Sequence, residues 1–313
     1  MSKTIGLVGA RGYTGRELIR LMAMRDDLAL AFASSREYEG RLVGEVAPGA
    51  PDGLRFSALS PDEVAASGVD AVVLALPNGA AAPFVAALEA EAPDTLIVDL
   101  SADYRFDDSW TYGLPEIYGR DAIKSARRIS NPGCYATAGQ LAAAPLRGLL
   151  SGDVHVFGVS GYSGAGTKPS RKNDLEALKD NLMPYALSGH IHEREMARHL
   201  GEGVRFTPHV AEFFQGIVAT VHVELDAPIE RAALITRFRE AYADEALVEV
   251  REDIPEIADI AGRNGAVLGG FAMDESGKKA VIVSGVDNLL KGAAVQALQN
   301  LTLALGLEEF GQA

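Results

Sequence analysis

Apolar and polar positions along the first 130 residues follow the alternating rhythm of short strands and amphipathic helices. Four nearly continuous apolar runs are typical of parallel strands that are covered on both faces. The runs are Thr4–Gly9, Leu28–Ala33, Asp70–Leu76 and Leu96–Leu100. Segments with helical patterns separate them. This βαβ order predicts an α/β fold with a Rossmann-type, doubly wound parallel sheet.

The pattern changes near Cys134, where longer strands with few helices between them begin. These expected strands are Val154–Ser160, Gly216–Leu225, Leu247–Arg251, Val267–Met273 and Lys279–Gly285. Consecutive strands of this kind favour a mainly antiparallel sheet, so we expect an α+β domain after the parallel one. A strongly helical segment, Asn288–Leu307, closes the chain.

Composition narrows the functional classes. The 313 residues, 48% of them hydrophobic, suit about two domains. A net charge of -14 without a large Lys/Arg cluster argues against a nucleic-acid partner. No apolar run approaches the ~20 residues that cross a bilayer, so no membrane partner is expected. The single cysteine excludes an intrachain disulfide, and we expect a cytoplasmic protein.

A glycine-rich turn follows the first expected strand and opens the first helix. Such turns let the backbone approach a pyrophosphate at the positive end of a helix. The alternative is a tight strand–helix turn without a ligand. The residues expected to contact a dinucleotide here are Gly9, Arg11, Gly12, Tyr13, Thr14 and Gly15.

The end of the second strand favours NADP as the cofactor. NAD enzymes usually carry Asp or Glu there, which binds the ribose 2′-hydroxyl. Here Ser34, Ser35 and Arg36 occupy the place and suit a 2′-phosphate. The alternatives are that Glu37 faces the ribose and that Arg36 is an ordinary surface arginine. Ligands bind outside the carboxyl ends of parallel strands, so the segment after the third strand should border the nicotinamide. It consists of Leu76, Pro77 and Asn78.

Cys134 is the candidate nucleophile. It follows Pro132 and Gly133 and precedes an Ala/Leu-rich helical segment, so we expect it at a helix N-terminus, where a thiolate is stabilised. The alternative is a buried, inert cysteine. A thiolate beside a nicotinamide can displace phosphate from an acyl phosphate, after which hydride reduces the thioester to an aldehyde. The expected partners are therefore a small-molecule acyl phosphate and inorganic phosphate.

Seven motifs are spread over nearly the whole chain. They are VGARGYTG near the start, LALPNG at Leu74–Gly79, DLSADYRF at Asp99–Phe106, YGLPE at Tyr112–Glu116, NPGCYAT at Asn131–Thr137, SGYSGAG at Ser160–Gly166 and DNLLKGAA at Asp287–Ala294. Together they resemble the N-acetyl-γ-glutamyl-phosphate reductases, an arginine-biosynthesis family related to aspartate semialdehyde dehydrogenase. The resemblance implies NADPH-dependent reduction of N-acetyl-γ-glutamyl phosphate to N-acetylglutamate 5-semialdehyde, with Cys134 as the nucleophile.

The resemblance also implies an acid/base group. The family carries a His-x-His-x-x-Glu motif, matched here by His190, His192 and Glu195. One histidine should exchange a proton with the substrate, because imidazole titrates near neutrality. Residues two apart do not share a helix face, so only one should reach Cys134. We prefer His192, with His190 second.

Further site residues complete the prediction. Phosphate is expected near Ser163, Gly164 and Gly166, where backbone N–H groups of small residues can converge on an anion. Arg105 is a candidate guanidinium partner of the phosphate. The alternative for the glycines is a flexible turn, and the alternative for Arg105 is a structural ion pair. By resemblance, Asn288 and Lys291 return to the cofactor from the last helix. The expected set also contains Ser101 for the cofactor and Asn131 and Glu195 for the substrate, and it contains no metal ligand.

The chain departs from the family pattern at two cationic positions. Relatives usually carry arginine where this chain has Ile191 and Gln215. The cation that binds the substrate carboxylate is therefore not identified, and the candidates are Arg194, Lys168 and Arg171.

We expect an NADP-binding domain of residues 1–133 and 287–313, and a catalytic and oligomerisation domain of residues 134–286. By resemblance, the protein is expected to be a homodimer or homotetramer. Two alternative functions stay open. One is a sibling reductase acting on aspartyl phosphate or another acyl phosphate. The other is an NADP-binding redox sensor without turnover.

Overall fold

The computed structural model describes residues 2–201 and 203–311, which form two compact units. Unit 1 contains residues 2–132 and 293–311, and unit 2 contains residues 133–201 and 203–292. The expected domain ranges also include residues 1, 202 and 312–313, which lie outside the described residues.

Unit 1 is built on a six-stranded parallel sheet in the order β2-β1-β3-β4-β6-β5. Its strands are β1 (Lys3–Val8), β2 (Leu28–Ser34), β3 (Ala71–Leu74), β4 (Leu96–Asp99), β5 (Thr111–Tyr112) and β6 (Arg128–Ser130). Because β1 lies between β2 and β3, the strand order reverses there, and ligands of open α/β sheets bind at such a switch point. The predicted Rossmann-type sheet is confirmed.

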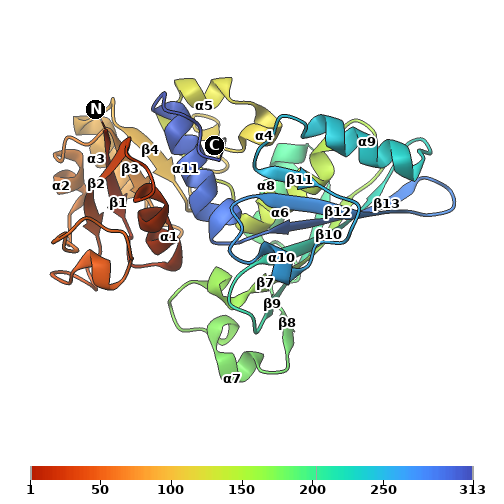
Figure 1. Ribbon diagram of the computed structural model, residues 1–313, viewed down its shortest axis with the longest axis horizontal. Helices are drawn as coiled ribbons and strands as arrows, with labels where there is room; N and C mark the ends of the chain where they lie inside the picture. Colours follow the sequence, from red (N-terminus) through yellow and green to blue (C-terminus); the bar gives the residue numbers. More distant parts are fainter. Residues whose placement is uncertain (1, 202, 312–313) are drawn as a thin grey trace. The chain divides into compact units, whose positions relative to one another are not determined.

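Helices cover this sheet on both faces (Figure 1). They are α1 (Tyr13–Met22), α2 (Pro61–Ala65), α3 (Ala82–Glu91), α4 (Pro115–Tyr118), α5 (Asp121–Ser125) and α11 (Val295–Ala304), with a 3₁₀ turn, η1 (Val43–Glu45). On one face, α2 and α3 share a hydrophobic core with Val72, Leu74 and Ile97 of the sheet. The intervening residues Val73 and Val98 are equally buried and face the other way. On that side α1 and α11 contact each other, so the C-terminal helix completes the first unit.

Unit 2 contains a seven-stranded sheet in the order β11-β12-β13-β10-β7-β9-β8. The strands are β7 (Val154–Gly161), β8 (Leu182–Pro184), β9 (Val204–Ala211), β10 (Ile217–Glu224), β11 (Val248–Val250), β12 (Ala266–Met273) and β13 (Lys279–Val286). Among the described strands of this second sheet, only the β7/β9 and β11/β12 pairs are parallel. The predicted mainly antiparallel sheet is therefore confirmed, although the sequence did not predict β8 or β9.

The helix α6 lies against this sheet, in contact with β10, β13 and α8. The helices of unit 2 are α6 (Cys134–Ala143), α7 (Leu175–Leu178), α8 (Ile191–Leu200), α9 (Arg231–Ala241) and α10 (Ile257–Ile260). Shorter turns are η2 (Ala144–Leu146), η3 (Tyr162–Ala165), η4 (Arg171–Asn173) and the π-type η5 (Leu290–Ala294), which runs from unit 2 into unit 1. Small residues let α6 approach its neighbours, and Met196 of α8 fills the space where a Cβ at Gly139 would lie. Cys134 thus begins a buried, closely packed helix.

No helix within residues 2–201 and 203–311 combines the length and apolar character needed to cross a lipid bilayer.

Candidate active site

The glycine-rich turn of unit 1 needs two of its glycines for its own geometry. Gly9 has a φ of +85°, a conformation that side chains disfavour, and a Cβ there would collide with the carbonyl oxygen of Ala75 just after β3. A Cβ at Gly15 would lie 2.6 Å from the carbonyl oxygen of Ala10. These glycines let α1 and β3 approach the end of β1 closely.

Gly12 has a different role, because its surroundings are open. It is the N-cap of α1, and a Cβ there would have the Gly9 carbonyl oxygen, at 3.8 Å, as its nearest contact among the described residues other than its two chain neighbours. The first turn of α1, which begins with Tyr13 and Thr14, contains no acidic residue. The backbone N–H groups and the positive dipole end of such a helix N-terminus fit the pyrophosphate of a dinucleotide.

The segment after β2 carries Arg36, and Arg11 of the glycine-rich turn reaches the same segment in unit 1. Ser34 and Ser35 are buried at the end of β2, and the Ser34 carbonyl oxygen accepts hydrogen bonds from the Gly9 and Ala10 amides at 3.0 and 3.1 Å. Arg36 is exposed. Arg11 pairs with Glu37 at 2.9 Å, so the structure brings the glycine turn to the segment where the sequence predicts the 2′-phosphate.

The loops after β3 and β4 are joined by hydrogen bonds. The Asn78 Oδ1 atom accepts from the Ala102 amide at 3.0 Å, which ties the exposed Pro77–Asn78 corner and half-buried Leu76 to the next loop. Ser101 is buried and donates its hydroxyl proton to Asp99 at 2.6 Å. Burial raises the pKa of Asp99 to about 6, although the hydrogen bonds from Ser101 act in the opposite direction.

Arg105 and Asn131 brace the carboxyl edge of the parallel sheet. The buried Arg105 guanidinium donates to the carbonyl oxygens of Asn131 and Leu100, each at 2.8 Å. The Asn131 side chain donates to the Ala293 carbonyl oxygen at 3.3 Å and accepts from Asn300 of α11 at 3.0 Å. Both side chains therefore hold loops of unit 1 in place.

Cys134 is the first residue of α6 in unit 2, and its side chain is partly exposed. The first turn of α6 contains no acidic residue, so the helix dipole favours a thiolate there. The Gly133 amide, one residue earlier, donates to the buried carboxylate of Glu195 at 2.8 Å. A Cβ at Gly292 would lie 2.7 Å from the Cys134 Cβ, so that glycine allows η5 to approach the nucleophile.

Aromatic and imidazole rings gather beside Cys134. The ring of Tyr135 lies 6.0 Å from that of His192 and 6.5 Å from that of His190. Burial, and then the neighbouring Cys134, raise the pKa of the Tyr185 hydroxyl well above its ordinary value. Burial, followed by Tyr185 and Cys134, also raises the pKa of Tyr135. Both hydroxyls stay protonated at neutral pH and can donate hydrogen bonds.

The two motif histidines have different environments. His190 caps α8 through its Nδ1 atom, which accepts from the His192 amide at 3.1 Å. Burial, and then Lys172, lower the pKa of His190 to about 4. The Lys172 ammonium lies 4.6 Å from the centre of the Tyr185 ring. Sequence reasoning missed Tyr185 and Lys172, because neither belongs to a recognisable motif.

The small-residue turn of unit 2 is organised around Asn288. The Asn288 amide donates to the Ser163 hydroxyl at 2.9 Å and accepts from the Gly216 amide at 2.7 Å. The Ser163 amide donates to the Phe214 carbonyl oxygen at 3.0 Å, and the Gly166 amide donates to the Ser163 carbonyl oxygen, also at 3.0 Å. Gly164 is exposed at the tip, and Lys291 is fully buried in η5.

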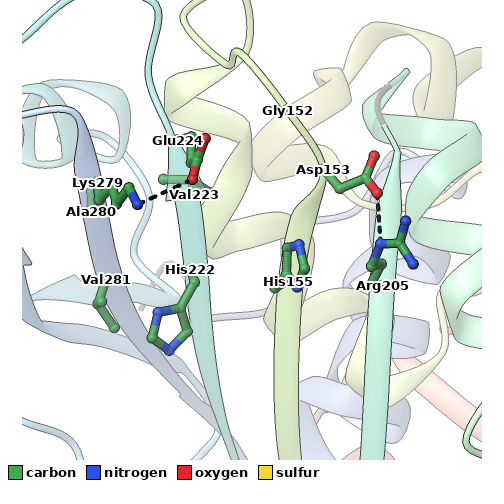
Figure 2. Close-up of a pocket in the computed structure, with 10 residues that line it drawn as sticks. All are labelled: Gly152, Asp153, His155, Arg205, His222, Val223, Glu224, Lys279, Ala280 and Val281. Carbon is green, nitrogen blue, oxygen red and sulfur yellow. Dashed lines mark hydrogen bonds and ion pairs between the residues drawn. The ribbon is translucent and has the colours of Figure 1, made fainter.

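A hollow of about 510 Å³ lies elsewhere on unit 2, and none of the expected site residues lines it. Figure 2 shows His155 and His222 side by side between two ion pairs. The pairs are Asp153–Arg205, at 2.8 Å, and Glu224–Lys279, at 3.6 Å. Among the described residues, no cluster of His, Cys, Asp and Glu has the arrangement of a metal site.

Two family profiles match the chain. The profile for the semialdehyde dehydrogenase NAD binding domain matches residues 4–126, and the profile for the semialdehyde dehydrogenase dimerisation domain matches residues 134–288. The chain is also 57% identical to the N-acetyl-gamma-glutamyl-phosphate reductase of Stenotrophomonas maltophilia (strain R551-3), over 98% of this chain and 96% of that protein.

Solved structures share the fold at low sequence identity. Aspartate semialdehyde dehydrogenase II of Vibrio cholerae, complexed with ASA, has a TM-score of 0.79 at 18% identity, over 98% of this chain and 99% of that chain. Aspartate semialdehyde dehydrogenase of Candida albicans, solved with NADP, has a TM-score of 0.74 at 15% identity, with the same coverage.

Proposed function

The chain belongs to the semialdehyde dehydrogenase family, as its motifs predicted, and from this premise we propose that it reduces N-acetyl-γ-glutamyl phosphate to N-acetylglutamate 5-semialdehyde with NADPH. The closely similar reductase of Stenotrophomonas maltophilia supports the acetylated substrate and a role in arginine biosynthesis. The observation that carries the proposal is the partly exposed Cys134 at the start of α6, next to Tyr135, whose ring lies 6.0 Å from that of His192 of α8.

The proposed mechanism begins at Cys134. The N-terminus of α6 stabilises its thiolate, which attacks the acyl carbon; the bond from that carbon to the phosphate oxygen breaks, and a thioester remains. Bound NADPH supplies the hydride that reduces this thioester. His192 exchanges the proton with the oxygen of the tetrahedral intermediate. The carbon–sulfur bond then breaks, which releases the aldehyde and restores the thiolate.

The proposed cofactor is NADP rather than NAD. The family profile supports a nicotinamide cofactor, and the Candida albicans relative was solved with NADP. In this chain, Arg36 follows β2, and Arg11 of the glycine-rich turn reaches Glu37 of the same segment, where a 2′-phosphate would bind. Because Glu37 pairs with Arg11, the negative charge of Glu37 is balanced within the protein. Unit 1 is thus the proposed cofactor domain.

Unit 2 is the proposed catalytic domain, and it offers one more cation than the sequence suggested. Lys172 lies over the Tyr185 ring in the neighbourhood of His190, so it joins Arg171, Lys168 and Arg194 as a candidate for the substrate carboxylate. The exposed Gly164 at the tip of the small-residue turn remains the proposed phosphate contact.

We also propose that unit 2 forms the subunit contact of a homodimer or homotetramer. Its family profile is that of a dimerisation domain. Phe157 is 41% exposed on β7, beside Thr220 and Thr207 on the neighbouring strands, so the outer face of the sheet is the proposed contact. The proposed compartment is the cytoplasm, where Cys134 stays reduced.

An assay of the reverse reaction separates the candidate functions. NADP reduction is followed at 340 nm with phosphate and either N-acetylglutamate semialdehyde or aspartate semialdehyde. The proposal predicts phosphate-dependent turnover of the acetylated substrate and a decrease of about 100-fold or more in His192→Asn. Preference for aspartate semialdehyde would identify a sibling reductase. No turnover, together with rapid alkylation of Cys134, would support a redox sensor.

A further inference from the structure

The N-terminus of α8 uses an imidazole in an unusual way. His190 is the N-cap, and its Nδ1 atom accepts the hydrogen bond from the His192 amide at 3.1 Å. N-caps are most often Ser, Thr, Asp or Asn, whose side-chain oxygen accepts this bond. An imidazole nitrogen accepts a hydrogen bond only when it carries no proton. The contact therefore selects the tautomer that has its proton on Nε2.

We propose that His190 is a positioning residue, whose unprotonated Nδ1 atom caps α8 and thereby orients His192 for proton exchange. The inference rests on the proposed function, since it takes Cys134 as the nucleophile and His192 as the acid/base. The two histidines of the His-x-His-x-x-Glu motif then have different roles. His190 holds the helix terminus, and His192, two residues later, moves the proton.

The surroundings of His190 favour this neutral, capping form. Its ring lies 5.7 Å from that of Tyr185 and 5.2 Å from that of Phe206. Burial and the ammonium group of Lys172 lower its pKa to about 4, while Glu193 acts in the opposite direction. Protonation of Nδ1, which would destroy the cap, is therefore suppressed at neutral pH.

A second clamp fixes the same turn of α8. The Glu193 carboxylate accepts from the Gly189 amide at 3.2 Å and from the Phe206 amide of β9 at 2.9 Å. Glu193 joins the turn to the sheet, whereas the His190 cap acts on the backbone of His192 itself. Loss of the cap should therefore misplace His192 before it unfolds the helix.

Substitutions at His190 separate capping from acid/base catalysis. Asn caps a helix as well as any residue, so His190→Asn should keep kcat within about threefold of the wild type. His190→Ala has no cap, and we expect its kcat to fall about tenfold or more at an unchanged KM for NADP. A true acid/base would lose about 100-fold or more in either variant. His199→Ala, at the other end of α8, is the matched control.

The pH profile provides a readout that a merely structural role would not give. The pKa governing kcat should persist in His190→Asn and disappear in His192→Asn. A decrease of about 100-fold in His190→Asn, with loss of that pKa, would overturn the proposal.

The tautomer can be measured in the wild-type protein without relying on turnover. Long-range ¹H–¹⁵N spectra of histidine-labelled protein, assigned by the signal missing in His190→Asn, should show His190 with a proton on Nε2 alone between about pH 5.5 and 8.5. A proton on Nδ1, or titration of His190 near neutrality, contradicts the inference even in an active enzyme. Absence of wild-type turnover, by contrast, contradicts the proposed function.

Discussion

The carboxylate of Glu195 accepts a hydrogen bond from the Gly133 amide at 2.8 Å, so α8 and the turn that carries Cys134 are held together through one buried contact. Glu195 lies three residues after His192 on the same helix. The contact therefore couples the position of the proposed acid/base to that of the proposed nucleophile.

Glu195→Ala should lower kcat by about 10- to 100-fold and destabilise the protein by about 1–3 kcal/mol, because it leaves the buried Gly133 N–H group without its acceptor. Glu195→Gln retains an acceptor oxygen and should lose less. The measurements are steady-state kinetics, thermal unfolding and the rate at which iodoacetamide alkylates Cys134. Arg198→Ala, exposed on the same helix, is the control. If Glu195 bound substrate instead, KM would rise while kcat and the alkylation rate stayed unchanged.

Arg36→Ala should raise the KM for NADP by about tenfold or more and leave the KM for NAD unchanged, since a charged hydrogen bond to the 2′-phosphate contributes about 1.5–3 kcal/mol. Initial rates at saturating semialdehyde and phosphate test this directly. Lys124→Ala, an exposed lysine of α5, serves as the control. An unchanged KM for NADP would make Arg36 an ordinary surface residue.

Asp99 should make unit 1 sensitive to pH. Burial raises its folded-state pKa to about 6 from an ordinary 3.8, so the folded protein binds this proton more tightly than the unfolded chain. The contribution of Asp99 to stability is therefore favourable at low pH and is lost as pH rises from about 4 to about 6, by up to about 3 kcal/mol.

Asp99→Asn removes this titration. The melting temperature of the variant minus that of the wild type should therefore be higher at pH 7 than at pH 4. A difference that does not change with pH would show that Asp99 does not titrate in this range.

The sequence predicted the fold well where burial is continuous. The four apolar runs of the first domain correspond to β1, β2, β3 and β4, because parallel strands covered on both faces carry a strong apolar signal. The two-residue strand β5 is too short to show a period. In β9, Pro208 in mid-strand hides the pattern, since proline is rare within sheets. The last helix starts with the π-type turn η5, which no periodicity distinguishes from an α-helix.

The sequence likewise predicted some residues of the candidate site, whereas others were found only in the structure. Motifs predicted Cys134 and its place at a helix N-terminus, because a strand, a Pro-Gly pair and a helical segment are local features. Tyr185 and Lys172 come to the site through the fold of a long connection between β7 and β9, which sequence spacing does not reveal. The roles of His190 and Glu195 depend on single hydrogen bonds, so they follow only from the structure.

The decisive experiment for the proposed mechanism is to determine whether Cys134 carries the acyl group. Wild-type protein is mixed with N-acetylglutamate semialdehyde and NADP in the absence of phosphate, and NADPH is followed at 340 nm while the protein is quenched for mass spectrometry. The thioester mechanism predicts a burst of about one NADPH per subunit and one N-acetylglutamyl group on the peptide that contains Cys134, with neither in Cys134→Ser. A full burst in Cys134→Ser, or an acyl group on another residue, would contradict it.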